Sequence, residues 1–201
     1  RQKSWLNGWI PVVEYSWEDQ KIKYAVEMFG FPLNGEDAGN TLQFIKVKIT
    51  NKRGVSARPH FAVATRSTGE EYRFDASQFS PDWVYGISNN EIVRNGKLIY
   101  TFSGGGHVDA KYGNDYAGPF KASDLNVQKN TPVCLVNYSP ALKPGASSEY
   151  IFKMPRIPVD TGNRAVILKI DQADFAKYRA RTIHFWENLV LKDSSTFSIP
   201  E

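Results

Sequence analysis

Acidic side chains are the residues of this sequence that could serve in acid–base chemistry. Two carboxyl groups can act as general acid and general base, or as acid and nucleophile, when both reach the same bond. The pairs Glu18-Asp19 and Glu70-Glu71 fall where a turn and a loop are expected. The full set of candidates, none in a recognisable catalytic pattern, is Glu14, Glu18, Asp19, Glu70, Glu71 and Asp75. We therefore predict solvated turn charges and no catalytic residue in this chain.

The glycine run Gly104-Gly105-Gly106 is the most conspicuous local motif, and it precedes His107 and Asp109. Glycine permits positive φ angles and lets the backbone approach a ligand closely. The run lacks the Lys-Ser/Thr of a phosphate-binding loop and the spacing of a dinucleotide fingerprint. The sequence therefore indicates either a flexible loop between strands or a loop that holds His107 and Asp109 against a ligand.

No metal or cofactor is predicted. Asp109, Asn114 and Asp115 offer oxygen ligands that suit Ca²⁺, but their spacing does not match an EF-hand loop. The three histidines are far apart in the sequence and form none of the spacings of a zinc site. Cys134 is the single cysteine, which excludes an internal disulfide and a cysteine-based zinc site. We expect its thiol to lie in the core.

Aromatic residues are abundant, with 5 Trp, 10 Tyr and 12 Phe. Flat aromatic rings can stack on the C–H face of a sugar ring. The segment Asp82-Trp83-Val84-Tyr85 is the best candidate for an exposed cluster, so Trp83 and Tyr85 are predicted carbohydrate contacts. The competing interpretation is that the aromatic residues fill the space between two sheets or are buried against a partner domain.

The elements that must position these side chains follow mainly a period of two, which is typical of half-buried strands. Alternating segments are 22–28, 45–49, 61–66 and 149–154, and 133–138 is more continuously apolar, as in a central strand. Asn95-Gly96 between two short apolar runs predicts a hairpin. Short strands with regular turns favour an antiparallel sandwich. Lys46 and Lys48 are interpreted as charges that protect a sheet edge.

The period changes near the C-terminus. From Asp171 to about Lys192 the apolar residues recur at steps of three and four, which predicts one amphipathic helix. Asp171 is the expected N-cap, and Asp174 suits the first turn. Residues 165–170 form a last short apolar run before it. The predicted organisation is a sandwich over residues 1–170 and a linker helix with an extended tail over 171–201.

Composition excludes several classes of protein. The chain has 201 residues, of which 41% are hydrophobic and 23% are charged, so it is not intrinsically disordered. No apolar run approaches the ~20 residues of a transmembrane helix. The net charge is +4 and the charges are scattered, so neither a nucleic-acid arm nor a membrane patch is predicted. Because the chain begins at Arg1, we interpret it as a fragment or a processed product.

Several stretches resemble one domain type. They are residues 9–17, 21–29 and 41–51, and above all the phrase Phe185-Trp186-x-x-Leu189 followed by Phe197-x-Ile199-Pro200-Glu201. This pattern resembles the N-terminal β-sandwich of bacterial glycoside hydrolases and the linker that leads into their (α/α)6 catalytic barrel. The resemblance implies an all-β fold: a large two-sheet antiparallel β-sandwich of the supersandwich kind, with a C-terminal linker helix.

The same resemblance implies a non-catalytic domain that supports an (α/α)6 catalytic domain of the same polypeptide. It implies an interface formed by the helix residues Phe175, Tyr178, Phe185, Trp186 and Leu189. The loop with His107 and Asp109 would lie at the rim of the substrate cleft. Export from the cell is expected from relatives that degrade polysaccharides. The alternatives are an autonomous carbohydrate-binding module and, less favoured, a complete small enzyme.

Overall fold

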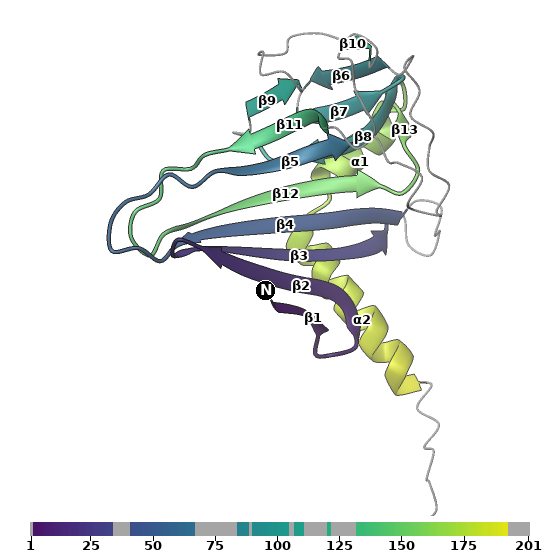
Figure 1. Cartoon of the computed structure of the whole chain (residues 1–201). Helices are drawn as coiled ribbons and strands as arrows, with labels where there is room; N and C mark the ends of the chain where they lie inside the picture. Colours follow the sequence, from purple (N-terminus) through teal and green to yellow (C-terminus); the bar gives the residue numbers. More distant parts are fainter. Residues whose placement is uncertain are drawn as a thin grey trace, which may run out of the picture.

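The chain is an antiparallel β-sandwich with two helices on its outer face (Figure 1). The computed structural model describes residues 2–33, 41–66, 84–88, 90–104, 107–110, 120–121 and 132–192. Over these ranges the strands form one large and one small sheet, and the neighbouring strands are paired antiparallel. The predicted fold class, an all-β two-sheet sandwich with C-terminal helical structure, is confirmed.

The large sheet contains ten strands within the described residues. In spatial order they are β1 (Gln2–Leu6), β2 (Ile10–Asp19), β3 (Ile22–Pro32), β4 (Thr41–Asn51), β12 (Ser147–Pro155), β8 (Lys97–Phe102), β7 (Glu91–Arg94), β6 (Val84–Ser88) and β10 (Phe120–Lys121), while β13 (Val159–Asp160) pairs with β8. The small sheet has the order β5 (Phe61–Arg66), β11 (Pro132–Tyr138) and β9 (His107–Ala110). The central position of residues 133–138 in a sheet is therefore confirmed.

Two-residue turns fix the register of two hairpins. Asn95 and Gly96 join β7 to β8 with φ values of 49° and 71°, as the Asn-Gly dipeptide predicts. Gln20 and Lys21 join β2 to β3 in the same way, with φ values of 46° and 61°. Both residues of such a turn need positive φ, which asparagine and glycine adopt more readily than other residues.

The first hydrophobic core lies between the two sheets. Alternate residues of β3, namely Ile22, Tyr24 and Val26, are buried on the side that faces the small sheet. They meet Val136 and Tyr138 of β11. The Tyr138 hydroxyl donates a hydrogen bond of 2.9 Å to the Ser103 carbonyl. Burial raises the pKa of this phenol well above its ordinary value, and the nearby Tyr150 adds to the shift.

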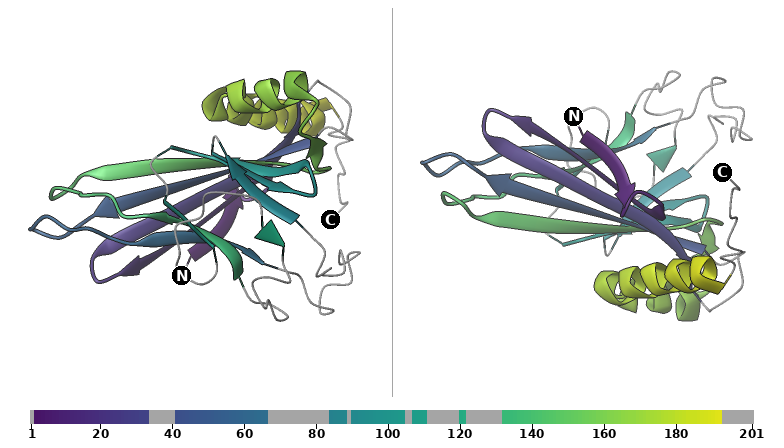
Figure 2. Two further views of the ribbon diagram at one scale, coloured as in Figure 1. Left: turned by 90° about the horizontal axis from the view of Figure 1, so that it is seen from above. Right: turned by 90° about the horizontal axis from the view of Figure 1, so that it is seen from below.

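The second core lies on the opposite face of the large sheet, under helices α1 (Arg164–Gln172) and α2 (Phe175–Lys192). Figure 2 shows both helices on one side of this sheet and the small sheet on the other. Phe29 and Phe44 stack at 5.0 Å on neighbouring strands and meet Ile167, Ile170 and Phe175 of the helices. No helix among the described residues has the length and apolarity needed to cross a membrane.

The helical region differs from its prediction. Residues 165–170, interpreted as a short apolar run before the helix, lie within α1, and Asn163 caps its start. Ala173 is extended and separates the helices. Asp174 rather than Asp171 caps the start of α2, because its Oδ1 accepts a 2.7 Å hydrogen bond from the Lys177 backbone N–H. A short apolar run cannot distinguish a strand from a helix by period alone, and here burial of residues three apart decides for the helix.

The interpretation of Lys46 and Lys48 as edge charges is wrong. Their strand β4 lies between β3 and β12, in the interior of the large sheet. Lys46 Nζ lies 4.5 Å from the ring centroid of Phe175, and Lys48 Nζ lies 3.2 Å from Glu149 Oε1 on β12. The two lysines therefore mark where the outer face of the sheet passes from the helix-covered part to open solvent.

Candidate docking surface

Helix α2 carries all five residues that the sequence assigned to a domain interface. In the structure some of them pack on the chain's own sheet and others are exposed to solvent. Phe175 is only 5% exposed, and its ring meets that of Phe29 at 5.1 Å. The Tyr178 ring lies 5.0 Å from that of Phe44, and its hydroxyl donates to the Leu33 carbonyl at 3.1 Å. These two residues hold α2 on the chain's own large sheet, and their part in a domain interface stays a prediction.

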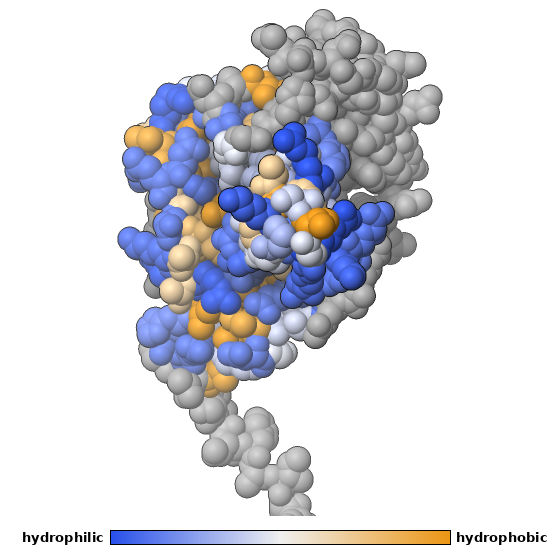
Figure 3. Space-filling view, turned by 90° about the vertical axis from the view of Figure 1, so that its left-hand side faces the viewer, coloured by the Kyte–Doolittle hydropathy of each residue, from blue (hydrophilic) through white to orange (hydrophobic). Residues whose placement is uncertain are grey.

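The C-terminal half of α2 presents apolar side chains to solvent. Phe185 is 50% exposed, Val190 is 47% exposed and Leu189 is 39% exposed. Trp186 is partly buried at the margin of the second core, with its ring 5.7 Å from that of Phe185. In Figure 3 apolar side chains gather at this end of the molecule, around the last turns of α2, while polar side chains cover much of the remaining face.

A shallow hollow of about 370 Å³ lies beside these exposed residues. We call it the α2 surface, and its lining residues are Phe31, Arg181, His184, Phe185, Asn188 and Leu189. The Arg181 guanidinium lies 5.3 Å from the ring centroids of both Phe31 and Tyr178, a cation–π arrangement. His184 and Asn188, one turn apart, are hydrogen-bonded at 2.8 Å. The surface thus has an apolar centre and a polar rim.

Arg179 fixes the orientation of α2 on the sheet. Its Nε lies 2.6 Å from Glu27 Oε1 of β3, and its Nη2 lies 3.8 Å from Glu14 Oε1 of β2. Glu14 and Glu27 face each other across the two strands, so their like charges share one guanidinium. Glu14, a candidate for acid–base chemistry in the sequence, therefore has a structural partner here.

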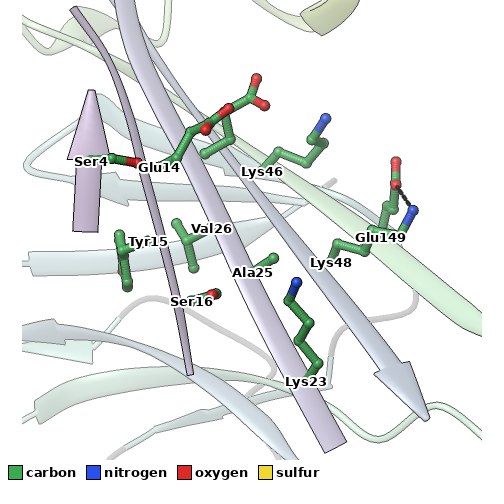
Figure 4. Close-up of a pocket in the computed structure, with 11 residues that line it drawn as sticks. Ser4, Glu14, Tyr15, Ser16, Lys23, Ala25, Val26, Lys46, Lys48 and Glu149 are labelled. Atoms are coloured by element: carbon green, nitrogen blue, oxygen red, sulfur yellow. Dashed lines mark ion pairs between the residues drawn. The ribbon is translucent and has the colours of Figure 1, made fainter. Parts of the chain in front are cut away.

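The uncovered part of the same sheet face forms a polar groove of about 350 Å³ (Figure 4). Its lining includes Glu14, Lys23, Lys46, Lys48 and Glu149, and the figure marks the Lys48–Glu149 ion pair. Lys46 is paired with Glu27 of β3, and Lys48 with Glu149 of β12, and such opposite-charge pairs on neighbouring strands stabilise a sheet.

The candidate pair Glu18-Asp19 lies at the end of β2, before the turn to β3. Glu18 Oε2 accepts a 2.6 Å hydrogen bond from Lys52 Nζ, and both side chains are about half exposed. The prediction of a solvated charge beside a turn is confirmed for Glu18. Glu70, Glu71 and Asp75 lie outside the described residues.

The predicted carbohydrate residues fall on different sheets. Trp83 lies outside the described residues, and Tyr85 is on β6 of the large sheet, opposite Arg94. His107 and Asp109 lie in β9 of the small sheet, opposite Asn137 and Leu135. The expected loop 103–109 thus ends in a strand. The side chains of Tyr85, His107 and Asp109 lie outside the described part of the chain, and their contact with a carbohydrate stays a prediction.

His60 immediately precedes β5, and Cys134 lies in β11, the central strand of the small sheet. His60 is exposed, and its Nε2 lies 3.0 Å from Asn137 Oδ1. Cys134 is in β11, between Thr65 of β5 and Ala110 of β9, and its thiol is outside the described part of the chain. Among the residues that the structure describes, no three His, Cys, Asp or Glu side chains are grouped so that they could hold a metal ion. Asn114 and Asp115 lie outside that part.

The structure also shows a cleft that the sequence did not predict, at the junction of α1 and α2. It has a volume of about 490 Å³, and its lining includes Asn90, Thr101, Lys153, Asp171 and Asp174. Thr101 and Lys153 are partners across β8 and β12, but they are far apart in the sequence. The sequence offered one signal for this cleft, which is the position of Lys153 between Phe152 and Met154 in an alternating strand. In the structure Lys153 lies on the face of that strand that the helices cover.

No family model matches this sequence, and no curated protein matches it. Among solved structures, the chain is similar to part of a human-microbiome protein assigned as a kojibiose phosphorylase. The two are 13% identical, and the TM-score is 0.46. The match covers 89% of this chain and 23% of that chain, so this chain spans about a quarter of the length of the protein it matches.

Proposed function

We propose that this chain is the non-catalytic N-terminal β-sandwich domain of a larger glycoside hydrolase and that it docks an (α/α)6 catalytic domain of the same polypeptide. The observation that carries the proposal is the division of α2. One half of this helix is buried on the chain's own sheet, and the other half presents the exposed rings and side chains of the α2 surface. The sequence resemblance described above supplies the class of partner.

The composition of the α2 surface supports docking by a protein. Phe185 and Leu189 lie one turn apart at its centre, and Arg181, His184 and Asn188 surround them. Stable protein interfaces combine an apolar centre with a polar rim, and aromatic and arginine side chains are enriched among their strongest contacts. A partner that covers Phe185 would remove one of the largest exposed apolar side chains of the described chain from water.

The rigid attachment of α2 favours the same role. Phe175, Tyr178 and Arg179 hold the first half of the helix on the sheet, so the second half is presented in a fixed position. Preorganised surfaces lose less conformational entropy on binding than mobile ones. Helix α2 ends at Lys192, within one turn of Leu189, so a domain attached after it would have a high effective concentration at this surface.

The carboxylates of the large sheet support a structural rather than a catalytic role. Glu14 and Glu27 hold Arg179, Glu149 pairs with Lys48, and Glu18 pairs with Lys52. Each of these groups has a partner that stabilises the position of a strand or a helix. The proposal therefore assigns the reacting carboxylates to the partner domain.

The test begins with the parent gene, in which the sequence after Glu201 should encode paired amphipathic helices. That segment is then produced separately and titrated with the 201-residue chain by isothermal calorimetry. We expect 1:1 binding, and we expect the chain alone to cleave no glycosidic bond. A reading frame that stops shortly after Glu201, or glycosidic cleavage by the chain itself, would overturn the proposal.

The surface is tested with two matched variants. Phe185→Ser with Leu189→Ser should weaken binding by at least about tenfold, because both remove apolar contacts from the centre of the interface. Leu168→Ser is the control, since Leu168 is an equally exposed apolar residue on α1, away from the α2 surface. Equal affinity of the double variant and the control would show that the partner binds elsewhere.

A further inference from the structure

We propose that the cleft at the α1–α2 junction binds a small, neutral, polyhydroxylated ligand such as a monosaccharide. This junction cleft lies between β8, β12 and the ends of the two helices, and the residues used below are Asn90, Thr101, Lys153, Asp171 and Asp174. Its volume of about 490 Å³ falls within the ~300–1,000 Å³ of small-molecule sites. The inference does not depend on the docking role of α2, because the junction cleft and the α2 surface share no residue.

A row of polar side chains crosses the sheet beneath the helices and carries the inference. Glu91, Thr101 and Lys153 are successive cross-strand partners on β7, β8 and β12. The next partner along the row is Phe44 of β4, which belongs to the second core. Side chains directly opposite each other in a sheet share a face. Three polar residues therefore lie on the face of the sheet that the helices cover, where the row continues with the apolar Phe44.

Two members of the row have partners in the chain. Glu91 is 3% exposed, and its carboxylate lies 3.6 Å from the Arg164 guanidinium of α1. Lys153 Nζ donates to the Ile170 carbonyl at 3.0 Å and to the Asp171 carbonyl. These contacts hold the C-terminal end of α1 on the sheet. The polar row is thus built into the attachment of the helix.

Thr101 differs from its two neighbours. It is only 6% exposed, and its hydroxyl makes no hydrogen bond with any side chain or carbonyl of the described residues. A buried hydroxyl without a partner destabilises the folded state, whereas valine would fill the same space without that cost. Because Thr101 lines the junction cleft, a ligand in the cleft can supply the missing partner.

The other groups around the cleft define the chemistry of the ligand. The Lys153 ammonium has three donors and uses two on helix carbonyls, which leaves one. Asp171 and Asp174 supply carboxylate oxygens, and Asn90 supplies an amide. Burial lowers the pKa of Lys153, and the two nearby carboxylates oppose that shift.

Donors and acceptors therefore alternate around one small space. Hydroxyl groups both donate and accept, so a ligand with several of them satisfies this arrangement. One ammonium beside two carboxylates disfavours an anion such as phosphate, because the carboxylates would repel it. Neutral sugars and polyols fit both requirements.

The test is a titration of the ¹⁵N-labelled 201-residue chain with glucose, galactose, mannose and myo-inositol, followed by backbone amide NMR. We expect saturable shifts of the amides around Asn90, Thr101 and Ala173 with at least one probe, at a Kd of about 1 mM. Inorganic phosphate and methylammonium are titrated in parallel. Stronger shifts with either ion, or no saturable shift with any sugar, would overturn the proposal.

Two threonine variants separate ligand binding from structure. Thr101→Val should weaken the sugar about tenfold through one lost hydrogen bond. Its midpoint of thermal unfolding should be unchanged or higher, since the hydroxyl has no hydrogen-bond partner among the residues that the structure describes. Thr50→Val on the same sheet is the control, because the Thr50 hydroxyl is exposed and bonded to Ser147 at 2.8 Å, away from the cleft. Unchanged affinity in Thr101→Val, or a lower unfolding midpoint, would contradict the assignment.

Discussion

Arg179 of α2 and Glu27 of β3 are separated by 152 residues of sequence, yet their side chains meet with Nε 2.6 Å from Oε1. Both side chains are mostly buried, so water screens this ion pair less than the pairs at the surface. The contact joins the last helix to the second hairpin of the chain. It is the polar counterpart of the apolar contacts that Phe175 makes with the same sheet.

Replacement of Arg179 by methionine should lower the free energy of unfolding by about 1–3 kcal/mol, since a charge-assisted hydrogen bond is lost and Glu14 and Glu27 face each other without a counter-ion. Urea denaturation monitored by circular dichroism measures this change. Lys48→Met is the matched control: the Lys48–Glu149 pair is about half exposed, and its loss should cost less than about 1 kcal/mol. Equal losses of unfolding free energy in the two variants would mean that burial does not make the Arg179 ion pairs stronger than the exposed Lys48–Glu149 pair.

Phe175→Ala and Phe185→Ala change the same residue type on one helix. Phe175→Ala should lower the free energy of unfolding by about 3–5 kcal/mol, because it leaves a cavity in the second core. Phe185→Ala should change that free energy by less than about 0.5 kcal/mol in the isolated chain, since the Phe185 ring is half exposed. Denaturation of both variants under the same conditions checks the difference. A large loss in Phe185→Ala would show that its exposed ring is not free in solution.

Asn51 is a completely buried amide at the end of β4. Its Nδ2 donates to the carbonyls of Val55, Leu142 and Lys143, at 2.9 to 3.2 Å, and its Oδ1 accepts from the Arg53 backbone at 2.9 Å. Asn51→Ala should cost about 3 kcal/mol or more, because several buried backbone groups lose their partner together.

Thermal unfolding of Asn51→Ala beside Asn188→Ala checks this prediction. Asn188 is half-buried on α2, and its amide makes an exposed hydrogen bond with His184, so its replacement should change the unfolding midpoint far less. Similar midpoints for the two variants would contradict a central role of Asn51 in joining the loops 51–57 and 142–146.

The Tyr138 phenol gives a pH dependence of known sign. Its pKa is raised in the folded chain by burial, so the unfolded state releases this proton first, near pH 10. The stabilisation linked to Tyr138 is fully present below that pH and is lost as the pH rises further. Tyr138→Phe removes the ionisation together with the hydrogen bond to Ser103, at a cost of about 1 kcal/mol at neutral pH.

The wild-type chain and Tyr138→Phe should therefore converge in stability between pH 10 and the limit of alkaline unfolding. Free energies of unfolding measured at several pH values for both proteins give the difference directly. Comparison with the variant cancels the other groups that titrate in this range, among them Tyr24, whose pKa is also raised by burial. A difference that stays constant above pH 10 would show that the Tyr138 hydroxyl is solvated.

Local patterns predicted the strands well, and the reason is visible in β3 and β12. Each has one face in the inter-sheet core and one face toward the helices or solvent, so alternation in the sequence reflects burial directly. The Asn95-Gly96 turn was predicted for the same reason, since its two positive φ values depend only on the residues at the turn.

Pairing partners could not be predicted from the same patterns. Lys46 and Lys48 alternate with apolar residues whether their strand lies at an edge or inside a sheet, and only the distant strand β12 makes β4 an interior strand. The break at Ala173 was missed because apolar residues recur at helical spacing on both sides of it, and the pattern alone does not reveal one extended residue. The sequence also could not predict which half of α2 is buried, because that depends on how far the large sheet extends beneath the helix.

The candidate sites also differ in how far local patterns could predict them. Phe185 and Leu189 of the α2 surface stood out in the sequence because they belong to the apolar pattern of one helix, whereas Phe31 of β3 did not. Thr101 and Lys153 did not, because the junction cleft joins β8 to β12 and neither residue lies in a motif. Sites assembled from separate strands become visible only when the register of the sheet is known.

The second core draws Ile10 and Val12 from the start of the chain and Ile167, Ile170 and Phe175 from near its end. A ribosome therefore releases almost the whole sandwich before the helices that cover Phe29 and Phe44 have been made. During that interval the outer face of β2, β3 and β4 is an open hydrophobic surface, and growing chains with such surfaces are substrates for chaperones. Folding of this domain is consequently completed only when α2 has left the exit tunnel.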